Sequence, residues 1–354
     1  MSNYTDYIGT RPVADAHRFD VGPLESYLAT RIEGFKGPLR VEQFKGGQSN
    51  PTYRLEASGK RYVLRRKPPG TLLPSAHAVD REYRVISALA STEVPVARTY
   101  LLCTDESVIG TMFYVMDCVE GRVLWDPQLP GMKPAERGAI FDELNRVIAA
   151  LHRVDYKAIG LADFGKPGNY FARQIDRWSR QYRASETERI EAMDRLIEWL
   201  PKHIPAGDET SIVHGDYRID NAIFHPEEPR ILAVLDWELS TLGHPLADFS
   251  YHMMAWRLSS TEFRGLRGCD LAAMGIPDED AYRERYLART GLRALSPDEW
   301  RFCMAYNMFR AAAIFQGVMA RAVAGNAASA KAVETGKRAR PMAELGWKQV
   351  EHLA

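Results

Sequence analysis

The sequence has few cysteines, no excess of charge of either sign and no internal repeat. Its four cysteines, Cys103, Cys118, Cys269 and Cys303, are widely separated and form no C-x-x-C pair, which argues against a zinc site and a disulfide framework. Lys plus Arg number 46, as do Asp plus Glu, so the formal charge is zero. We therefore expect neither nucleic acid nor a membrane as partner, and any anion should be bound locally.

The sequence also lacks a secretory signal and an uninterrupted membrane-length apolar segment. Residues 1–17 contain no apolar core of a signal peptide. The most apolar helical segment, residues 302–323, is interrupted by Asn307, Arg310 and Gln316, which predicts a buried helix of a water-soluble protein. A reducing, cytoplasmic location is the expectation.

The first third of the chain is patterned mainly as β-structure. Residues 39–68 alternate between apolar and polar side chains, with Gly-Gly and Ser-Gly turns, which predicts three antiparallel strands. Apolar residues at helical spacing predict a helix over 77–91, and two further strands are expected over 96–103 and 110–119. The pattern indicates a small sheet-rich N-terminal lobe, residues 1–119.

The remaining chain, residues 120–354, is predicted to be a mainly helical lobe. An apolar stripe along 140–151 marks one helix, and the segment 185–188 has a capping-box pattern that would begin another. Two short strands, 211–216 and 231–237, are expected to pair across a polar turn. The predicted fold class is therefore α+β, with two lobes.

The segment 212–224 reads IVHGDYRIDNAIF and sets polar residues between apolar runs. Phosphoryl transfer requires a carboxylate facing the acceptor hydroxyl, and Asp216 is the candidate base. It also requires oxygen ligands for the Mg²⁺ that bridges the phosphates, for which Asn221 and Asp236 are the candidates. The apolar flanks would hold the loop rigidly. The alternative is that these side chains only cap turns.

Phosphate-binding candidates lie in the N-terminal lobe. The run at 46–50 would bring backbone amides close to phosphates, and its candidate residues are Gly46, Gly47, Ser49 and Asn50. Arg65 could neutralise phosphates while paired with Glu82 on the following helix. Lys67 is the alternative cation, and a solvated basic edge is the alternative interpretation of both.

The adenine-binding candidate is the strand that ends at the lobe junction. The segment 113–121, FYVMDCVEG, turns from apolar to polar there, as expected where backbone groups bracket a base. The residues concerned are Met116, Asp117, Cys118 and Val119. A plain interlobe linker remains the alternative.

Together these motifs resemble the aminoglycoside-phosphotransferase-like branch of the protein-kinase-like fold. Residues 62–89, 108–131 and 211–251 are most similar to the kinase domain that some proteins carry joined to an acyl-CoA dehydrogenase domain. The resemblance implies a two-lobed kinase using ATP or GTP and Mg²⁺, with Asp216 as base. It also implies that His214 orients the loop through hydrogen bonds.

The sequence departs from the wider fold at two places. Arg65 stands where that fold has a lysine, and a guanidinium spreads its charge over a fork, so a different phosphate geometry is expected. Trp237 and Glu238 replace the Phe-Gly that follows the metal-binding aspartate in protein kinases. Asp248 follows Asp236 by only 12 residues. This segment is too short for a phosphorylation-controlled loop, which favours a small-molecule enzyme.

The acceptor is a small-molecule hydroxyl whose identity the sequence leaves open. Four arginines in the segment 170–184 could meet an anionic acceptor: Arg173, Arg177, Arg180 and Arg183. They could equally form a solvated helix face. With the resemblance they favour a hydroxyacyl-CoA, because the similar kinase domains are associated with such substrates. The alternatives are an aminoglycoside or another small alcohol, or a non-catalytic nucleotide-binding scaffold.

Overall fold

The computed structural model describes residues 8–46, 50–69, 77–261, 263–325 and 331–353. The chain divides into two compact units. Unit one comprises Met1–Trp125, Lys157–Leu161 and Asp220–Ser240, and unit two comprises Asp126–Tyr156, Ala162–Ile219 and Thr241–Ala354. Unit one thus includes the segment with Asn221 and Asp236.

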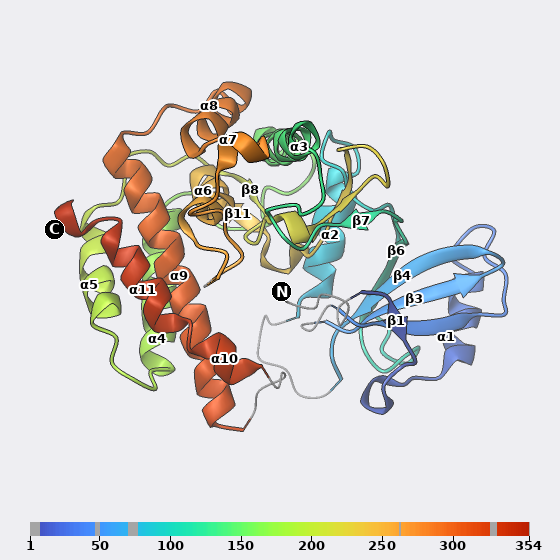
Figure 1. Cartoon of the computed structure of the whole chain (residues 1–354). Coiled ribbons are helices and arrows are strands. Elements are labelled where there is room, and N and C mark those ends of the chain that lie inside the picture. The colour runs from blue at the N-terminus through green and yellow to red at the C-terminus, as the bar shows by residue number, and fades with distance from the viewer. Residues whose placement is uncertain (1–7, 47–49, 70–76, 262, 326–330, 354) are drawn as a thin grey trace. The chain divides into compact units, whose positions relative to one another are not determined.

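Unit one is built on an antiparallel sheet (Figure 1). Its described strands lie in the order β1-β2-β3-β4-β6-β5. They are Thr10–Arg11 (β1), Arg40–Phe44 (β2), Thr52–Ala57 (β3), Lys60–Arg66 (β4), Thr99–Cys103 (β5) and Phe113–Asp117 (β6). The three antiparallel strands predicted over 39–68 are confirmed as β2, β3 and β4, and the two later strands as β5 and β6.

The alternating pattern of β3 explains which face of the sheet carries the core. Tyr53, Leu55 and Ala57 are buried, and they belong to one apolar cluster with Leu24 and Leu28 of helix Val21–Ala29 (α1). Helix Val79–Leu89 (α2), within the predicted range 77–91, contacts β5 and β6. The packed sheet and α2 therefore form a rigid framework that can hold charged side chains of β4 and α2 in fixed positions.

A second small sheet of unit one carries the segment after residue 220. Its strands, in the order β10-β9-β7, are Ile231–Val234 (β10), Ala222–Phe224 (β9) and Arg122–Val123 (β7). The predicted pairing of 211–216 with 231–237 is wrong. Residues 222–224 form an unpredicted strand, β9, which pairs with β10 instead. The loop between β9 and β10 is shorter than the one that the predicted pairing would need, so its closure costs less entropy.

In unit two, Ser211–Val213 (β8) pairs instead with Thr241–Gly243 (β11). The other described elements are helical, as predicted. The α-helices are Pro134–Arg153 (α3), Tyr170–Ala184 (α4), Glu191–Trp199 (α5), Pro245–Arg257 (α6), Leu271–Met274 (α7), Glu279–Thr290 (α8), Pro297–Val323 (α9), Ala332–Gly336 (α10) and Ala339–Lys348 (α11). Short 3-10 turns of this unit are Leu200–Lys202 (η3) and Glu351–Leu353 (η6), whereas Trp237–Leu239 (η5) belongs to unit one.

Helix α9 is the predicted buried helix and packs against α4, α6, α10 and α11 (Figure 1). Its three interior polar residues are buried but bonded. Asn307 Nδ2 donates to Ala247 O at 3.0 Å, and Gln316 Nε2 donates to Ser185 O at 3.0 Å. Arg310 Nη2 donates to Gly215 O at 2.6 Å. These side chains thus satisfy backbone carbonyls of other segments instead of marking a break in the helix.

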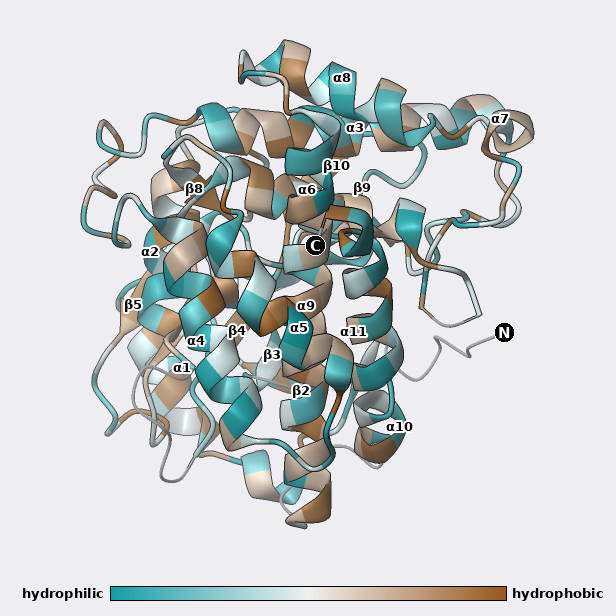
Figure 2. Cartoon of the chain, turned by 90° about the vertical axis from the view of Figure 1, so that its left-hand side faces the viewer, coloured by the Kyte–Doolittle hydropathy of each residue, from teal (hydrophilic) through white to brown (hydrophobic). Residues whose placement is uncertain are grey.

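The capping box predicted at 185–188 is wrong. Helix α5 begins at Glu191, with Ile190 as its N-cap, and has no side-chain cap. The Ser185 hydroxyl instead donates to Gln181 O at 2.9 Å, at the end of α4. Figure 2 shows both hydrophilic and hydrophobic residues along α4 and α5, in keeping with one buried and one exposed face.

Candidate active site

The β9–β10 hairpin brings the two predicted metal ligands to one end of the small sheet. Ala222 pairs with Val234, so Asn221 directly precedes one strand and Asp236 follows the other by two residues. Leu235 N donates to Asn221 O at 2.8 Å, which ties the two chain ends together. Asp236 has a positive φ of 65°. Such a conformation is uncommon for a residue other than glycine and concentrates at functional sites.

Arg65, on β4, joins this hairpin to helix α2. Its Nε lies 2.7 Å from Glu82 Oε2, so the predicted ion pair is present. Its Nη2 lies 3.0 Å from Asp236 Oδ1 and 3.6 Å from Glu238 Oε2. Burial opposes the charge, but the carboxylates, Glu82 foremost, raise the pKa of Arg65 and keep it cationic. One guanidinium thus faces three carboxylates, which leaves negative charge for a further cation to balance.

Glu82 is held from two more sides within unit one. Asn50 Nδ2 donates to its Oε1 at 2.7 Å, and the Tyr114 hydroxyl donates to its Oε2 at 3.1 Å. Asn50 is completely buried, so its side chain positions Glu82, whereas the sequence analysis gave it a phosphate contact. Gly47 and Ser49, the other candidates in that run, lie outside the described residues.

These groups line one cavity of about 480 Å³ in unit one. Of the predicted nucleotide and metal residues, those lining it are Gly46, Arg65, Glu82, Met116, Asp117, Cys118, Val119, Asn221 and Asp236. Apolar side chains such as Val63, Ile86 and Ile223 complete its wall. Lys67, the alternative cation, is not among the lining residues. The cavity therefore combines an apolar wall suited to a base with a charged end suited to phosphates.

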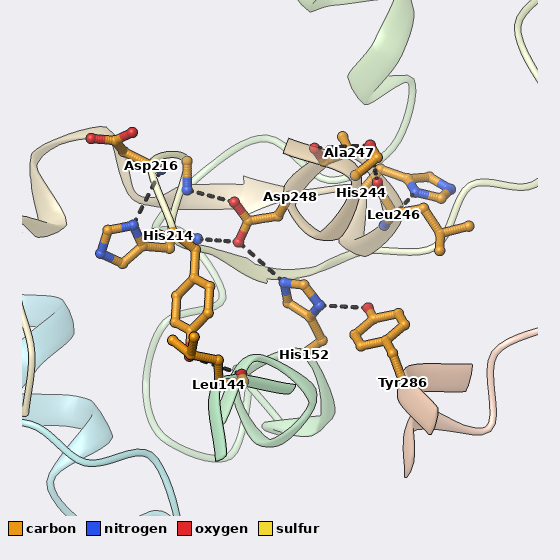
Figure 3. A network of polar contacts seen from close by, with 12 residues as sticks. Leu144, His152, His214, Asp216, His244, Leu246, Ala247, Asp248 and Tyr286 are labelled. Carbon is orange, nitrogen blue, oxygen red and sulfur yellow. Dashed lines mark hydrogen bonds and ion pairs between the residues drawn. The ribbon is translucent and has the colours of Figure 1, made fainter. Parts of the chain in front are cut away.

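The predicted catalytic loop belongs to unit two, where Asp248 on α6 anchors its backbone (Figure 3). Asp248 accepts hydrogen bonds from the His214 amide at 2.7 Å and from the Gly215 amide at 2.8 Å. Its Oδ2 also lies 3.2 Å from His152 Nε2. Burial alone would raise the pKa of Asp248, but the hydrogen bonds from His152 and the loop amides hold it below its usual range. An ionised, buried carboxylate thus fixes the turn before Asp216.

The His214 ring is buried, and its Nδ1 accepts the Asp216 amide at 3.2 Å. Gly215 has a positive φ of 85°, a conformation open to glycine without strain. In Figure 3 the Asp216 carboxylate points away from the Asp248 network. Its Oδ1 accepts a hydrogen bond from the Tyr251 hydroxyl at 2.5 Å and lies 3.3 Å from Arg218 Nε.

The sequence analysis missed the supporting residues of this loop, His152, Asp248 and Tyr251. One signal was available: Asp248 lies in an otherwise apolar stretch, where an ionisable group needs partners. Asp248 and Tyr251 are three residues apart, so they share one face of a helix. The identity of their partners depends on tertiary packing and could not be read from spacing.

The four predicted acceptor arginines follow one stripe of α4. Arg177, Arg180 and Arg183 are exposed, and Arg173 is half-buried. Arg180 pairs with Asp176 at 2.6 Å in the same helix, and Arg173 donates to Lys166 O at 2.5 Å. The apolar face is buried through Phe171, Trp178 and Tyr182. This geometry fits a solvated helix face at least as well as an anion site.

Comparison with known families identifies the chain. Residues 40–306 match the model of the phosphotransferase enzyme family. The chain belongs to the phosphotransferase enzyme family. The predicted fold class is confirmed as well, because solved phosphotransferases share the α+β architecture described above.

Two proteins similar in sequence and one similar in fold illustrate the comparison. Acyl-CoA dehydrogenase family member 10 of Mus musculus is 48% identical over 96% of this chain, which covers 32% of that protein. The chain therefore spans about a third of this relative's length. A crystal structure from Ralstonia eutropha, provisionally assigned as an aminoglycoside phosphotransferase, has 61% identity and a TM-score of 0.87 over 95% of this chain and 99% of that one.

The third is a thermostable mutant of the aminoglycoside phosphotransferase APH(4)-Ia, in ternary complex with ADP and hygromycin B. It has 16% identity and a TM-score of 0.58 over 92% of this chain and 98% of that one. At this identity the likeness concerns the fold alone.

Two kinds of feature are absent from the described residues. Across the described ranges there is no cluster of three or more His, Cys, Asp or Glu side chains able to hold a metal ion. None of the described helices meets the length and apolarity that crossing a membrane requires.

Proposed function

We propose that this phosphotransferase is a small-molecule kinase that transfers the γ-phosphoryl group of ATP to an acceptor hydroxyl. The observation that carries the proposal is the convergence of Arg65, Glu82, Asn221 and Asp236 on one cavity. Its apolar wall and charged end match the two halves of a nucleotide. The complex of APH(4)-Ia with ADP gives independent support for a nucleotide as phosphoryl donor, and GTP is the alternative donor.

Asp216 is proposed as the general base. The acceptor oxygen would form a bond to the γ-phosphorus while the bond to the β–γ bridging oxygen breaks and ADP leaves with that electron pair. The Asp216 carboxylate would orient the hydroxyl and take its proton. His214 would act on the loop alone, since its ring is buried and occupied with the Asp216 amide.

The residues of the hairpin fit a magnesium ion. Asn221 and Asp236 offer oxygen ligands, and Mg²⁺ commonly takes only one or two protein ligands beside phosphates and water. When bound, the metal would neutralise charge that develops on the phosphates.

Asp236→Ala tests this assignment by calorimetry. Removal of the Asp236 carboxylate should weaken Mg²⁺-dependent nucleotide binding by roughly a hundredfold or more, because the ion would lose one of its protein ligands. Nucleotide binding without Mg²⁺ should change little. Unchanged affinity for the magnesium–nucleotide complex would contradict the role of Asp236.

A hydroxyacyl-CoA is the proposed acceptor. The relative named as an acyl-CoA dehydrogenase family member supports an acyl-CoA connection, although this chain covers only 32% of it. Cations surround the catalytic loop of unit two, where Arg218 contacts Asp216 and Arg310 contacts Gly215. Such surroundings disfavour a polycationic aminoglycoside. The α4 arginines would contribute to the binding of the acceptor through ion pairs with the CoA phosphates.

The deciding experiment compares phosphorylation of hydroxyacyl-CoAs of varied chain length and hydroxyl position with that of kanamycin, hygromycin B and choline. Mass spectrometry would locate the added phosphoryl group. We expect a far higher kcat/KM with a hydroxyacyl-CoA. Robust phosphorylation of an aminoglycoside, with no activity on any hydroxyacyl-CoA, would return the function to antibiotic phosphorylation, which the provisional assignment of the Ralstonia eutropha protein favours.

A further inference from the structure

Helix α6 supports two different parts of the loop that carries Asp216. Asp248 holds the backbone amides of His214 and Gly215, and Tyr251, one turn later, donates to the Asp216 carboxylate. Both residues belong to a mostly buried helix, so neither contact depends on an exposed, mobile side chain. The same helix thus fixes the path of the loop and the orientation of its carboxylate.

The hydroxyl of Tyr251 can act only as a donor toward an ionised Asp216. Burial, and then the charge of Asp216, raise the pKa of Tyr251, so its proton stays in place across the working pH range. Its hydrogen bond to Oδ1, at 2.5 Å, restrains the rotation of the Asp216 carboxylate. The ring itself is fixed by Arg310, whose guanidinium lies 5.1 Å from the ring centroid.

The charged and titratable groups around Asp216 come from three segments of unit two. His214 and Arg218 belong to the loop itself, Tyr251 belongs to α6, and Arg310 belongs to α9. Arg218 is partly exposed, with 41% of its side chain accessible, so water screens its contact with Asp216. Tyr251, which is half-buried, donates a hydrogen bond to the carboxylate at 2.5 Å.

We propose that Tyr251 is a positioning residue for phosphoryl transfer, which holds the Asp216 carboxylate in the orientation that faces the acceptor. The inference rests on the proposed role of Asp216 as base. Tyr251 does not itself take the acceptor proton, because its hydroxyl is already protonated and hydrogen-bonded to Asp216. Its contribution is to the geometry of the carboxylate that does.

The test is Tyr251→Phe, which removes one oxygen and keeps the ring. Turnover should fall roughly tenfold, while affinity for the magnesium–nucleotide complex changes less than about twofold. The KM for the acceptor should change less than about threefold, so that the loss appears in kcat, because the hydrogen bond orients the base in the transition state and does not bind the substrate. Tyr282→Phe is the matched control, since it removes a buried hydroxyl that contacts His252 at 2.8 Å and leaves Asp216 untouched.

The outcomes separate this inference from the proposed function. If the wild type transfers phosphoryl groups but Tyr251→Phe keeps its turnover, Tyr251 has no positioning role and the inference is overturned. The same holds if Tyr282→Phe lowers the turnover as far. If the wild type transfers no phosphoryl group to any acceptor in the screen, both the inference and the proposed function fail.

Discussion

At the scale of single residues, Arg65 has two roles: it forms a buried ion pair with Glu82, and it lines the cavity proposed to bind the nucleotide. Arg65 is buried between α2 and the hairpin, with only a tenth of its side chain exposed. Its fork reaches Glu82 and Asp236 simultaneously, which one ammonium group could do less well. We infer that Arg65 prepares the position of Asp236 as well as the charge of the cavity.

Arg65→Ala should weaken nucleotide binding at least roughly tenfold, and more than Lys67→Ala, since Lys67 does not line the cavity. The loss of a buried ion-pair partner should also destabilise the fold by about 3–5 kcal/mol. Calorimetric titration and thermal unfolding of both variants measure the two effects. Arg65→Lys, which keeps the charge, serves as the folded control. A larger loss of affinity in Lys67→Ala would mean that the wrong cation was chosen.

The candidate site was predictable where residue type and spacing determine the chemistry. Asp216, Asn221 and Asp236 follow from the motif, and the pairing of Arg65 with Glu82 follows from a strand followed by a helix. The role of Asn50 was not predictable, because a polar residue beside a Gly-Gly run suggests a loop contact with phosphates. Its actual partner, Glu82, is 32 residues away in sequence and adjacent only in the fold.

At the scale of elements, periodicity predicted the long strands and helices correctly. Strands β2 to β6 and helices α2, α3 and α9 each have enough residues for the apolar pattern to be clear. The short strands β9 and β11 have three residues each, too few for a pattern, and the strand pairing was therefore assigned wrongly. The start of α5 was also predicted wrongly, because Ser185 caps the end of α4 and its hydroxyl donates to Gln181 O.

Helix α9 offers a test of local sequence control. Ser296 and Glu299 form a reciprocal capping box at its start. Ser296→Ala should lower the free energy of unfolding by about 1 kcal/mol, because one helical amide loses its acceptor. Ser296→Thr keeps the acceptor oxygen and should be nearly neutral. Denaturant unfolding of both variants measures the difference, and equal stabilities would show that tertiary packing alone sets the helix start.

At the scale of the whole molecule, the stability of unit two should depend on pH through His252. Burial lowers the pKa of His252 to about 4 from an ordinary value of 6.5. Between these values the unfolded chain binds a proton that the folded chain does not. Stability should therefore fall as the pH drops from about 6.5 to 4, by roughly 3 kcal/mol from this group.

Unfolding free energies measured across that range would check the expectation. His252→Gln, which can still bond the Tyr282 hydroxyl, should flatten the slope. The pKa of Glu299 is lowered to about 2, mainly by its hydrogen bond with Arg293. The stabilisation that this group provides is lost only as the pH falls below about 4.5, so it should add little to the slope above that pH. An unchanged slope in His252→Gln would show that His252 titrates normally in the folded protein.

The central claim is that Asp216 serves phosphoryl transfer from a nucleotide to an acceptor hydroxyl, and one measurement tests it most directly. ATP labelled at the γ-phosphorus is incubated with a hydroxyacyl-CoA and either the wild type or Asp216→Asn, and the label on the acceptor is followed in time. We predict transfer by the wild type, and a rate roughly a hundredfold to ten-thousandfold lower in Asp216→Asn with nucleotide affinity nearly intact. Equal rates of transfer in the two proteins would contradict the account.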